Sequence, residues 1–242
     1  MSETGHAKNV ANFETALLAL TALGAAYNPS QPLISLPALQ SVLDSAKAAM
    51  ITDSEKAAAR TVAVDDRQAA FGDLGKFSTT VGKAAAVDIN DSAFNEDMQT
   101  LVRLMNGRRA GDAPVDDPAT PDIDESQTAH SVSHRSYDNL ESNFGKIIDL
   151  LETKPTYKPN EVEFKIETLQ TKHDELKSVN LAAKTAAINA DNAREQRDAV
   201  LYNEETGILN LVQLIKKYLD YAFGKTSAVY QQINALKFRR VE

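Results

Sequence analysis

The sequence contains no cysteine and no tryptophan. Without cysteine the chain can form no disulfide bond, can supply no thiolate nucleophile and can offer no cysteine ligand to zinc. It also lacks a phosphate-binding glycine-rich loop and the Gly-x-Ser-x-Gly turn that presents a nucleophilic serine. These absences remove the most familiar catalytic constellations. We therefore predict that the protein is not an enzyme and that it holds no metal or cofactor.

Excess positive charge and long apolar runs are missing as well. The formal net charge is −8 and the isoelectric point is about 5.1, which opposes binding to the phosphates of nucleic acid. No stretch approaches the roughly 18 consecutive apolar residues of a membrane-spanning helix, and the first residues do not resemble a signal peptide. We expect neither nucleic acid nor membrane as a partner. A soluble protein in the cytoplasm is the default expectation, and export without a signal peptide stays open.

Aromatic residues are scarce, at 6% of the chain. Strands favour aromatic and β-branched residues, whereas Ala, Leu, Lys, Glu and Gln, which are abundant here, favour helices. The composition therefore predicts an all-α fold, and the spacing of apolar residues described below predicts an elongated helical bundle.

The second half of the chain resembles the first. A shift of 130 residues superposes the Tyr-x-Pro segments that start at Tyr27 and Tyr157, and a shift of 134 to 135 residues aligns the later parts. Other pairs in these registers are Leu39 with Leu169, Asp44 with Asp174, Lys47 with Lys177, Arg67 with Arg197, Lys83 with Lys217 and Leu101 with Leu236. We predict two tandem copies of one helical unit, although alanine-rich helices could also align through composition alone.

The predicted organisation is a first unit over residues 1–107, an acidic linker over 108–135 and a second unit over 136–242. The linker holds three prolines and six acidic residues, a composition that cannot bury enough apolar surface to fold. Within the units we expect helices at about 9–26, 36–71, 75–88 and 92–106, and at about 138–154, 160–202, 206–223 and 227–238.

The longest predicted helix of each unit has apolar or small residues at alternating steps of four and three, the spacing of a heptad repeat. These positions run from Leu36 to Phe71 and from Val162 to Leu201. The first helix could instead restart at Thr52-Asp53-Ser54-Glu55, which has the pattern of a capping box. We predict one continuous helix there and one core shared by both units; two independent domains are the alternative.

Several candidate polar sites give weak signals. His130 and His134 have the spacing of two metal ligands on one helix face, but no further ligand accompanies them. The acidic run Asp122–Glu125 lacks the glycine and the additional oxygen ligands of a calcium loop. His173 occupies a heptad position that Leu43 fills in the first unit, so we interpret it as structural. We expect ordinary solvated or packed roles for all of these side chains.

Arg67 and Arg197 occupy the same heptad register in the two units. An arginine at such a position must either extend to the surface or meet a carboxylate. We therefore expect ion pairs here rather than an anion-binding site. The acidic residues close to them in sequence are Asp65, Asp66, Glu195 and Asp198.

One property distinguishes the two predicted units. Residues 15–43 contain no charged side chain, whereas the corresponding span of the second unit contains ten. Contiguous uncharged patches commonly mark interaction sites, although an alanine-rich helix and a proline-rich loop could simply be uncharged. The residues that we assign to a candidate protein-contact surface are Leu17, Leu20, Leu23, Tyr27, Leu33, Ile34 and Leu36.

These observations favour a non-catalytic helical protein with a structural or protein-interaction role. We expect it to self-associate as a homo-oligomer, or to dock in a larger assembly, through residues 15–43. A membrane-active bundle of the pore-forming kind is the first alternative, and a small-molecule-binding bundle is the second.

Overall fold

The computed structural model describes residues 3–107 and 136–241. Helices fill most of both ranges, and no strand occurs in either of them, so the predicted all-α class is confirmed. The predicted linker, with His130, His134 and Asp122–Glu125, lies outside the described residues.

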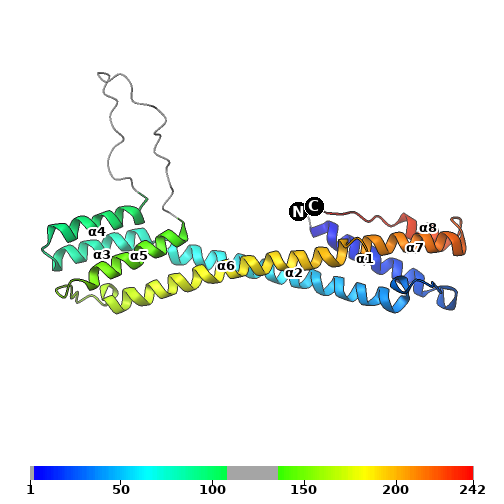
Figure 1. The fold of residues 1–242 in the computed structure, drawn as a ribbon, viewed down its shortest axis with the longest axis horizontal. Coiled ribbons are helices and arrows are strands. Elements are labelled where there is room, and N and C mark those ends of the chain that lie inside the picture. Colours follow the sequence, from blue (N-terminus) through cyan, green and yellow to red (C-terminus); the bar gives the residue numbers. More distant parts are fainter. Residues whose placement is uncertain (1–2, 108–135, 242) are drawn as a thin grey trace, which may run out of the picture. The chain divides into compact units, whose positions relative to one another are not determined.

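The helices of the first range follow the predicted order (Figure 1). They are α1 (Glu3–Thr21), short 3-10 turns at Gly24–Ala26 and Pro32–Ile34, α2 (Leu36–Phe71), α3 (Leu74–Asp88) and α4 (Ser92–Met105). The second range holds α5 (Tyr137–Glu152), a 3-10 turn at Val162–Phe164, α6 (Ile166–Tyr202), α7 (Ile208–Phe223) and α8 (Ala228–Ala235).

Helix α2 is continuous through Thr52–Glu55, as predicted. Pro37 stands in its first turn, where a missing backbone N–H costs no hydrogen bond, and Gly72 follows its last residue. Several other predicted boundaries are wrong: α1 begins at Glu3 and not at about residue 9, and α8 ends at Ala235 and not at about residue 238. Helix α1 ends at Thr21 because the chain turns at Gly24, whose φ is +56°, and α6 begins only at Ile166 because residues 162–164 form the 3-10 turn.

The chain forms two compact units that do not follow its order. Unit 1 comprises Met1–Thr61 and Ala186–Glu242, and unit 2 comprises Val62–Thr185. Helices α2 and α6 therefore each contribute residues to both units. Unit 1 takes α1 from the first predicted copy and α7 and α8 from the second, whereas unit 2 takes α5 from the second copy and α3 and α4 from the first. The duplication itself stays a prediction.

Each unit has its own hydrophobic core. In unit 1, α1, α7 and α8 pack against one another, and Phe13, Leu20 and Leu219 are almost completely buried. In unit 2, α4 packs against both α3 and α5 (Figure 1), and Phe144 and Leu151 are completely buried. Among the described residues the two clusters share no side chain, so there are two cores and not the single one that we expected. Each core nevertheless contains residues of both predicted copies.

The loop after α1 and the loop after α5 each contain a buried hydrogen bond of the same kind. Tyr27 Oη donates to the carbonyl oxygen of Ile34 at 2.7 Å, and Tyr157 Oη donates to that of Phe164 at 2.8 Å. Each bond fastens a loop to the 3-10 turn before a long helix. Burial of the phenol raises the pKa of both tyrosines, that of Tyr157 to about 12. The two units thus use the same device at the same place.

Candidate functional site

An uncharged groove of about 710 Å³ lies between α1 and the end of α7 with α8 in unit 1. None of the side chains that line it is ionisable in the physiological range. One wall consists of Thr15, Leu18 and Ala19 on α1 and of Ala22 and Leu23 directly after it. The other wall consists of Phe223 at the end of α7, Ser227, and Ala228, Val229 and Gln232 on α8. We call this surface the neutral groove.

The walls of the neutral groove are fixed by local structure. Helix α7 stops at Gly224, whose φ of +82° suits glycine, and Ser227 then caps α8 by accepting a hydrogen bond from the backbone N–H of Tyr230. On the other wall Leu18 is 67% exposed, so a large apolar side chain stands at the surface beside the groove. The neighbouring side chains of Ala19 and Ala22 are small, and they leave the space of the groove beside Leu18.

Unit 2 contains a counterpart of this groove between α4 and α5, with a volume of about 460 Å³. It is built from the same kinds of element, because α5, like α1, precedes a Tyr-x-Pro loop, and α4, like α8, is the second helix after a long one. Its lining contains three charged side chains. The residues are Asp97, Thr100, Leu101, Lys146, Asp149, Leu150 and Thr153. We call it the charged groove.

The two grooves can be compared position by position. Phe13 on α1 and Phe144 on α5 are both almost completely buried, which sets a shift of 131 residues between the helices. In this register Lys146 takes the place of Thr15, and Asp149 takes the place of Leu18. At these two positions unit 2 therefore carries charged side chains where unit 1 carries uncharged ones.

The sequence-predicted contact residues divide into two groups in the structure. Leu17, Leu20, Tyr27 and Ile34 are buried in the core of unit 1, so they are closed to an outside partner in this structure. Leu23 and Leu36 are half-buried, and Leu33 is 39% exposed. Of the whole set, the neutral groove contains only Leu23.

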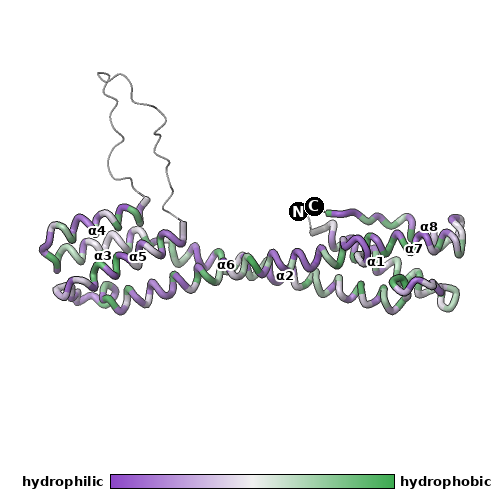
Figure 2. Tube along the Cα trace, viewed as in Figure 1, coloured by the Kyte–Doolittle hydropathy of each residue, from purple (hydrophilic) through white to green (hydrophobic). Residues whose placement is uncertain are grey.

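Sequence analysis missed Leu18, Phe223 and Val229 as lining residues. Leu18 could have been found, because α1 buries Phe13, Ala16, Leu17 and Leu20, and the 3.6-residue period then turns Leu18 outward. Phe223 and Val229 could not, since they reach α1 only through the tertiary fold. Figure 2 shows the neutral character of the region: the tube is mostly white and green from the second half of α1 to the start of α2, and carries more purple along α5 and early α6.

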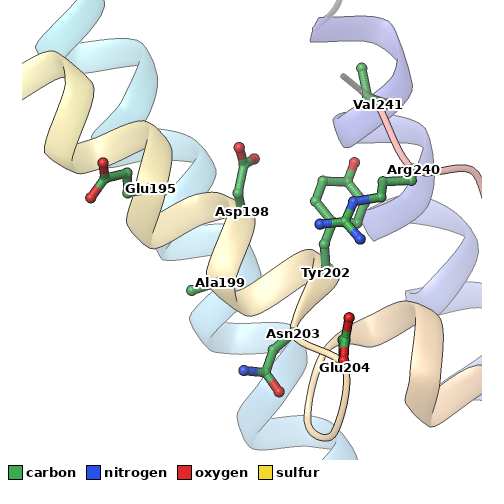
Figure 3. A pocket seen from close by; sticks show the side chains of 8 residues that line it. All are labelled: Glu195, Asp198, Ala199, Tyr202, Asn203, Glu204, Arg240 and Val241. Carbon is green, nitrogen blue, oxygen red and sulfur yellow. The ribbon is translucent and has the colours of Figure 1, made fainter.

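A second pocket of unit 1, of about 610 Å³, is polar (Figure 3). It lies where α6 ends and the segment after α8 passes, and its lining includes Glu195, Asp198, Tyr202, Glu204 and Arg240, whose guanidinium lies over the ring of Tyr202 at 5.9 Å. Asp198 accepts two hydrogen bonds from Arg197, at 2.9 and 2.8 Å. Among the described residues no group of His, Asp and Glu is arranged to hold a metal ion.

The two heptad arginines are held differently. In unit 1, Arg197 Nη1 lies 2.6 Å from Asp53 Oδ2, and both side chains are about nine-tenths buried. In unit 2, Arg67 lies over the ring of Tyr137 at 4.2 Å, and its Nη1 reaches the side-chain oxygen of Asn180 only at 3.5 Å. The expected partner Asp198 is found, and a second carboxylate partner of Arg197, Asp53, comes from α2.

His173 has the structural role predicted for it. Its ring is half-buried, lies 6.3 Å from the ring of Phe144, and packs against Gly145, where a Cβ atom would come within 3.1 Å of Nε2. The glycine thus makes room for the imidazole between α5 and α6.

Comparisons with known proteins give no relative: no family model, no curated protein and no solved structure matches the chain. Within residues 3–107 and 136–241, no helix combines the length and apolar character needed to cross a membrane.

Proposed function

We propose that this protein is a non-catalytic helical binding protein, and that it contacts an apolar helix of a partner protein through the neutral groove. The observation that carries this proposal is the contrast between two grooves of the same construction. The groove of unit 2 carries Lys146, Asp149 and Asp97, whereas the groove of unit 1 has no charge and exposes Leu18.

The chemistry of the neutral groove defines what it can hold. A charged side chain buried there would lose its hydration without gaining an opposite charge, which is costly. An apolar surface would instead release water from Leu18 and the adjacent hollow, at about 25 cal/mol per Å² of apolar area buried. Amphipathic helices commonly bind in such grooves and present residues at i, i+3, i+4 and i+7. A helix with a neutral apolar face is therefore the occupant that fits.

The test compares variants of the full chain as baits in native lysate. Leu18→Lys places a charge in the neutral groove at a side chain that is already exposed, so the fold should be unaffected. We expect proteins that bind the unaltered chain to be reduced at least tenfold with this variant. Self-association through the groove would be seen as a higher mass of the purified chain in light scattering, which Leu18→Lys should also reduce.

The charged groove supplies a matched control. Asp149→Lys changes the equivalent position of unit 2, from one exposed charge to another, and should leave the captured proteins and the mass unchanged. If Leu18→Lys captures the same proteins as the unaltered chain at the same level and has the same mass, the neutral groove is not a contact. Leakage of dye from anionic vesicles, lost in Leu18→Lys, would instead favour the membrane-active alternative.

A further inference from the structure

The segment that follows α8 runs extended along the first turns of α1 in unit 1. Asn9 is its main anchor: Nδ2 donates to the carbonyl oxygen of Arg239 at 2.6 Å, and Oδ1 accepts from the N–H of Arg239 at 3.1 Å. One side-chain amide thereby satisfies both backbone groups of a single residue. This contact recognises the main chain and would be the same whatever side chain stood at position 239.

Asn12 adds a second contact of the same kind. Its Nδ2 donates to the carbonyl oxygen of Lys237 at 2.7 Å. Asn9 and Asn12 are three residues apart and share one face of α1, while residues 239 and 237 are two apart on an extended chain. The intervening Phe238 turns the other way and packs on the core of unit 1. The spacing of the two asparagines along the helix therefore matches the spacing of residues 237 and 239 along the extended segment.

The end of the segment fits against Gly5. A Cβ atom at this position would lie 2.5 Å from Val241 Cγ2, so the absence of a side chain in the first turn of α1 is what lets Val241 approach. Beside it Tyr202 Oη lies 2.7 Å from His6 Nδ1 and accepts a hydrogen bond from Asn9 Nδ2 at 3.3 Å. Figure 3 shows Val241 beside α1 and Arg240 across the ring of Tyr202.

We propose that these four residues, Gly5, Asn9, Asn12 and Tyr202, form a binding seat for an extended peptide, and that the seat also accepts the 237–241 segment of a second copy of this chain. The segment is held by hydrogen bonds to its backbone, by the packing of Phe238 on the core and by the space at Gly5, and none of these contacts depends on the segment belonging to the same chain. A segment from another copy would make the same contacts. This proposal does not rest on the neutral groove, which uses other residues of α1.

The balance between the two modes follows from concentration. A short connection keeps the chain's own segment at an effective concentration on the order of millimolar, so the segment of the same copy wins at micromolar protein. At any moment only a small fraction of molecules therefore holds the segment of another copy. A disulfide between the two copies would trap these molecules so that they accumulate, and such a disulfide is simple to introduce because the chain has no cysteine of its own.

The geometry indicates where the trap belongs. A Cβ atom at Gly5 lies 3.7 Å from Val241 Cβ, within the 3.5–4.5 Å that disulfides need. The experiment mixes full-length Gly5→Cys with full-length Val241→Cys that carries a size tag, under a glutathione redox buffer. In the Gly5→Cys chain the new Cβ meets Cγ2 of its own Val241 at 2.5 Å, whereas the tagged copy carries the smaller cysteine at this position. We expect a disulfide-linked heterodimer to form at least fivefold faster than in the control mixture.

The control mixture replaces Gly5→Cys with Ala11→Cys, an exposed position on α1 outside the seat. The double variant Gly5→Cys/Val241→Cys should close within one chain and stay monomeric. Adding Asn9→Ala to the Gly5→Cys chain should lower the heterodimer yield at least fivefold. The proposal is overturned if the heterodimer forms no faster than in the control mixture, or if Asn9→Ala leaves its yield unchanged.

Discussion

The neutral groove of unit 1 and the charged groove of unit 2 are built from the same kinds of helix and differ in the chemistry of their walls. The interior positions agree, since Phe13 and Phe144 are both buried and both Tyr-x-Pro loops close with the same hydrogen bond. The exposed positions differ, with Leu18 in one groove and Asp149 in the other. Packing therefore explains what the units share, and it does not explain the missing charge.

The same comparison separates two interpretations of the uncharged span 15–43. Part of the span is uncharged because it is core: Leu17, Leu20, Tyr27 and Ile34 are buried. The remainder is exposed or half-buried, and the matching groove of unit 2 carries Lys146 and Asp149. The functional argument therefore belongs to the exposed remainder alone, and four kinds of substitution can test or refine it.

The largest effect is expected from the cores. Leu20 and its counterpart Leu151 are each 0% exposed, and replacing either with alanine should destabilise its unit by about 2–5 kcal/mol through lost burial and a cavity. Hydrogen exchange should show Leu20→Ala weakening protection in α7 and Leu151→Ala weakening it in α3 and α4. Equal losses in both units from a single substitution would show that the two cores unfold as one.

The two heptad arginines should respond differently. Asp53→Ala removes the buried partner of Arg197 and should cost about 2 kcal/mol, less than is typical of a fully isolated buried charge because Asp198 remains. Arg67→Met should change stability by less than about 1 kcal/mol, since it gives up a cation–π contact and relieves a buried Nε that has no partner. Urea unfolding of both variants measures the difference, and equal losses would contradict it.

The loop tyrosines should behave alike. Tyr27→Phe and Tyr157→Phe each leave a buried carbonyl oxygen without its donor, which should cost about 1–2 kcal/mol. A much smaller loss in one unit would mean that its loop is held by other contacts.

The same tyrosines predict the response to alkali. Their folded-state pKa is raised, to about 12 for Tyr157, whereas an unfolded tyrosine has a pKa of about 10. The neutral phenol is thus favoured by the fold, so its contribution is complete below pH about 10 and is lost as pH rises towards 12. Unfolding measured between pH 9 and 11 should show Tyr157→Phe losing stability less steeply than the unaltered chain. An unchanged slope would contradict the raised pKa.

The smallest effect is expected in the grooves. Leu33→Lys, Leu18→Lys and the reverse change Asp149→Leu all alter exposed side chains, and thermal unfolding should move by less than about 0.5 kcal/mol for each. Unfolding of Leu18→Lys would show that this leucine belongs to the core. Its effect on binding would then say nothing about the groove.

The sequence allowed most of the fold to be predicted, because helix periodicity is a local property. Leu39 and Leu169 are inward heptad positions and are fully buried, and the continuity of α2 followed from the same pattern. The pairing of helices could not be predicted. That α1 packs with α8, more than two hundred residues away, depends on tertiary contacts that leave no periodic trace.

Only part of the candidate site could be predicted from the sequence. The uncharged span was visible in the sequence, but the direction in which each leucine points depends on the phase of α1. The seat for residues 237–241 was not foreseen, because asparagines at helical spacing are common and become a peptide anchor only when an extended segment lies beside them. Its sequence signal is Gly5 in the first turn of a helix, a residue that helices disfavour.

The division of the chain between the units has a consequence for its synthesis on the ribosome. Unit 2 is contiguous, so all of its residues are available once Thr185 has left the exit tunnel. Unit 1 needs Ala186–Glu242 to complete the core begun by Phe13 and Leu20. At about 5–20 residues per second this delay lasts several seconds. The apolar side chains of α1 are therefore translated well before their partners on α7 and α8, and until those emerge they can pack only against α2.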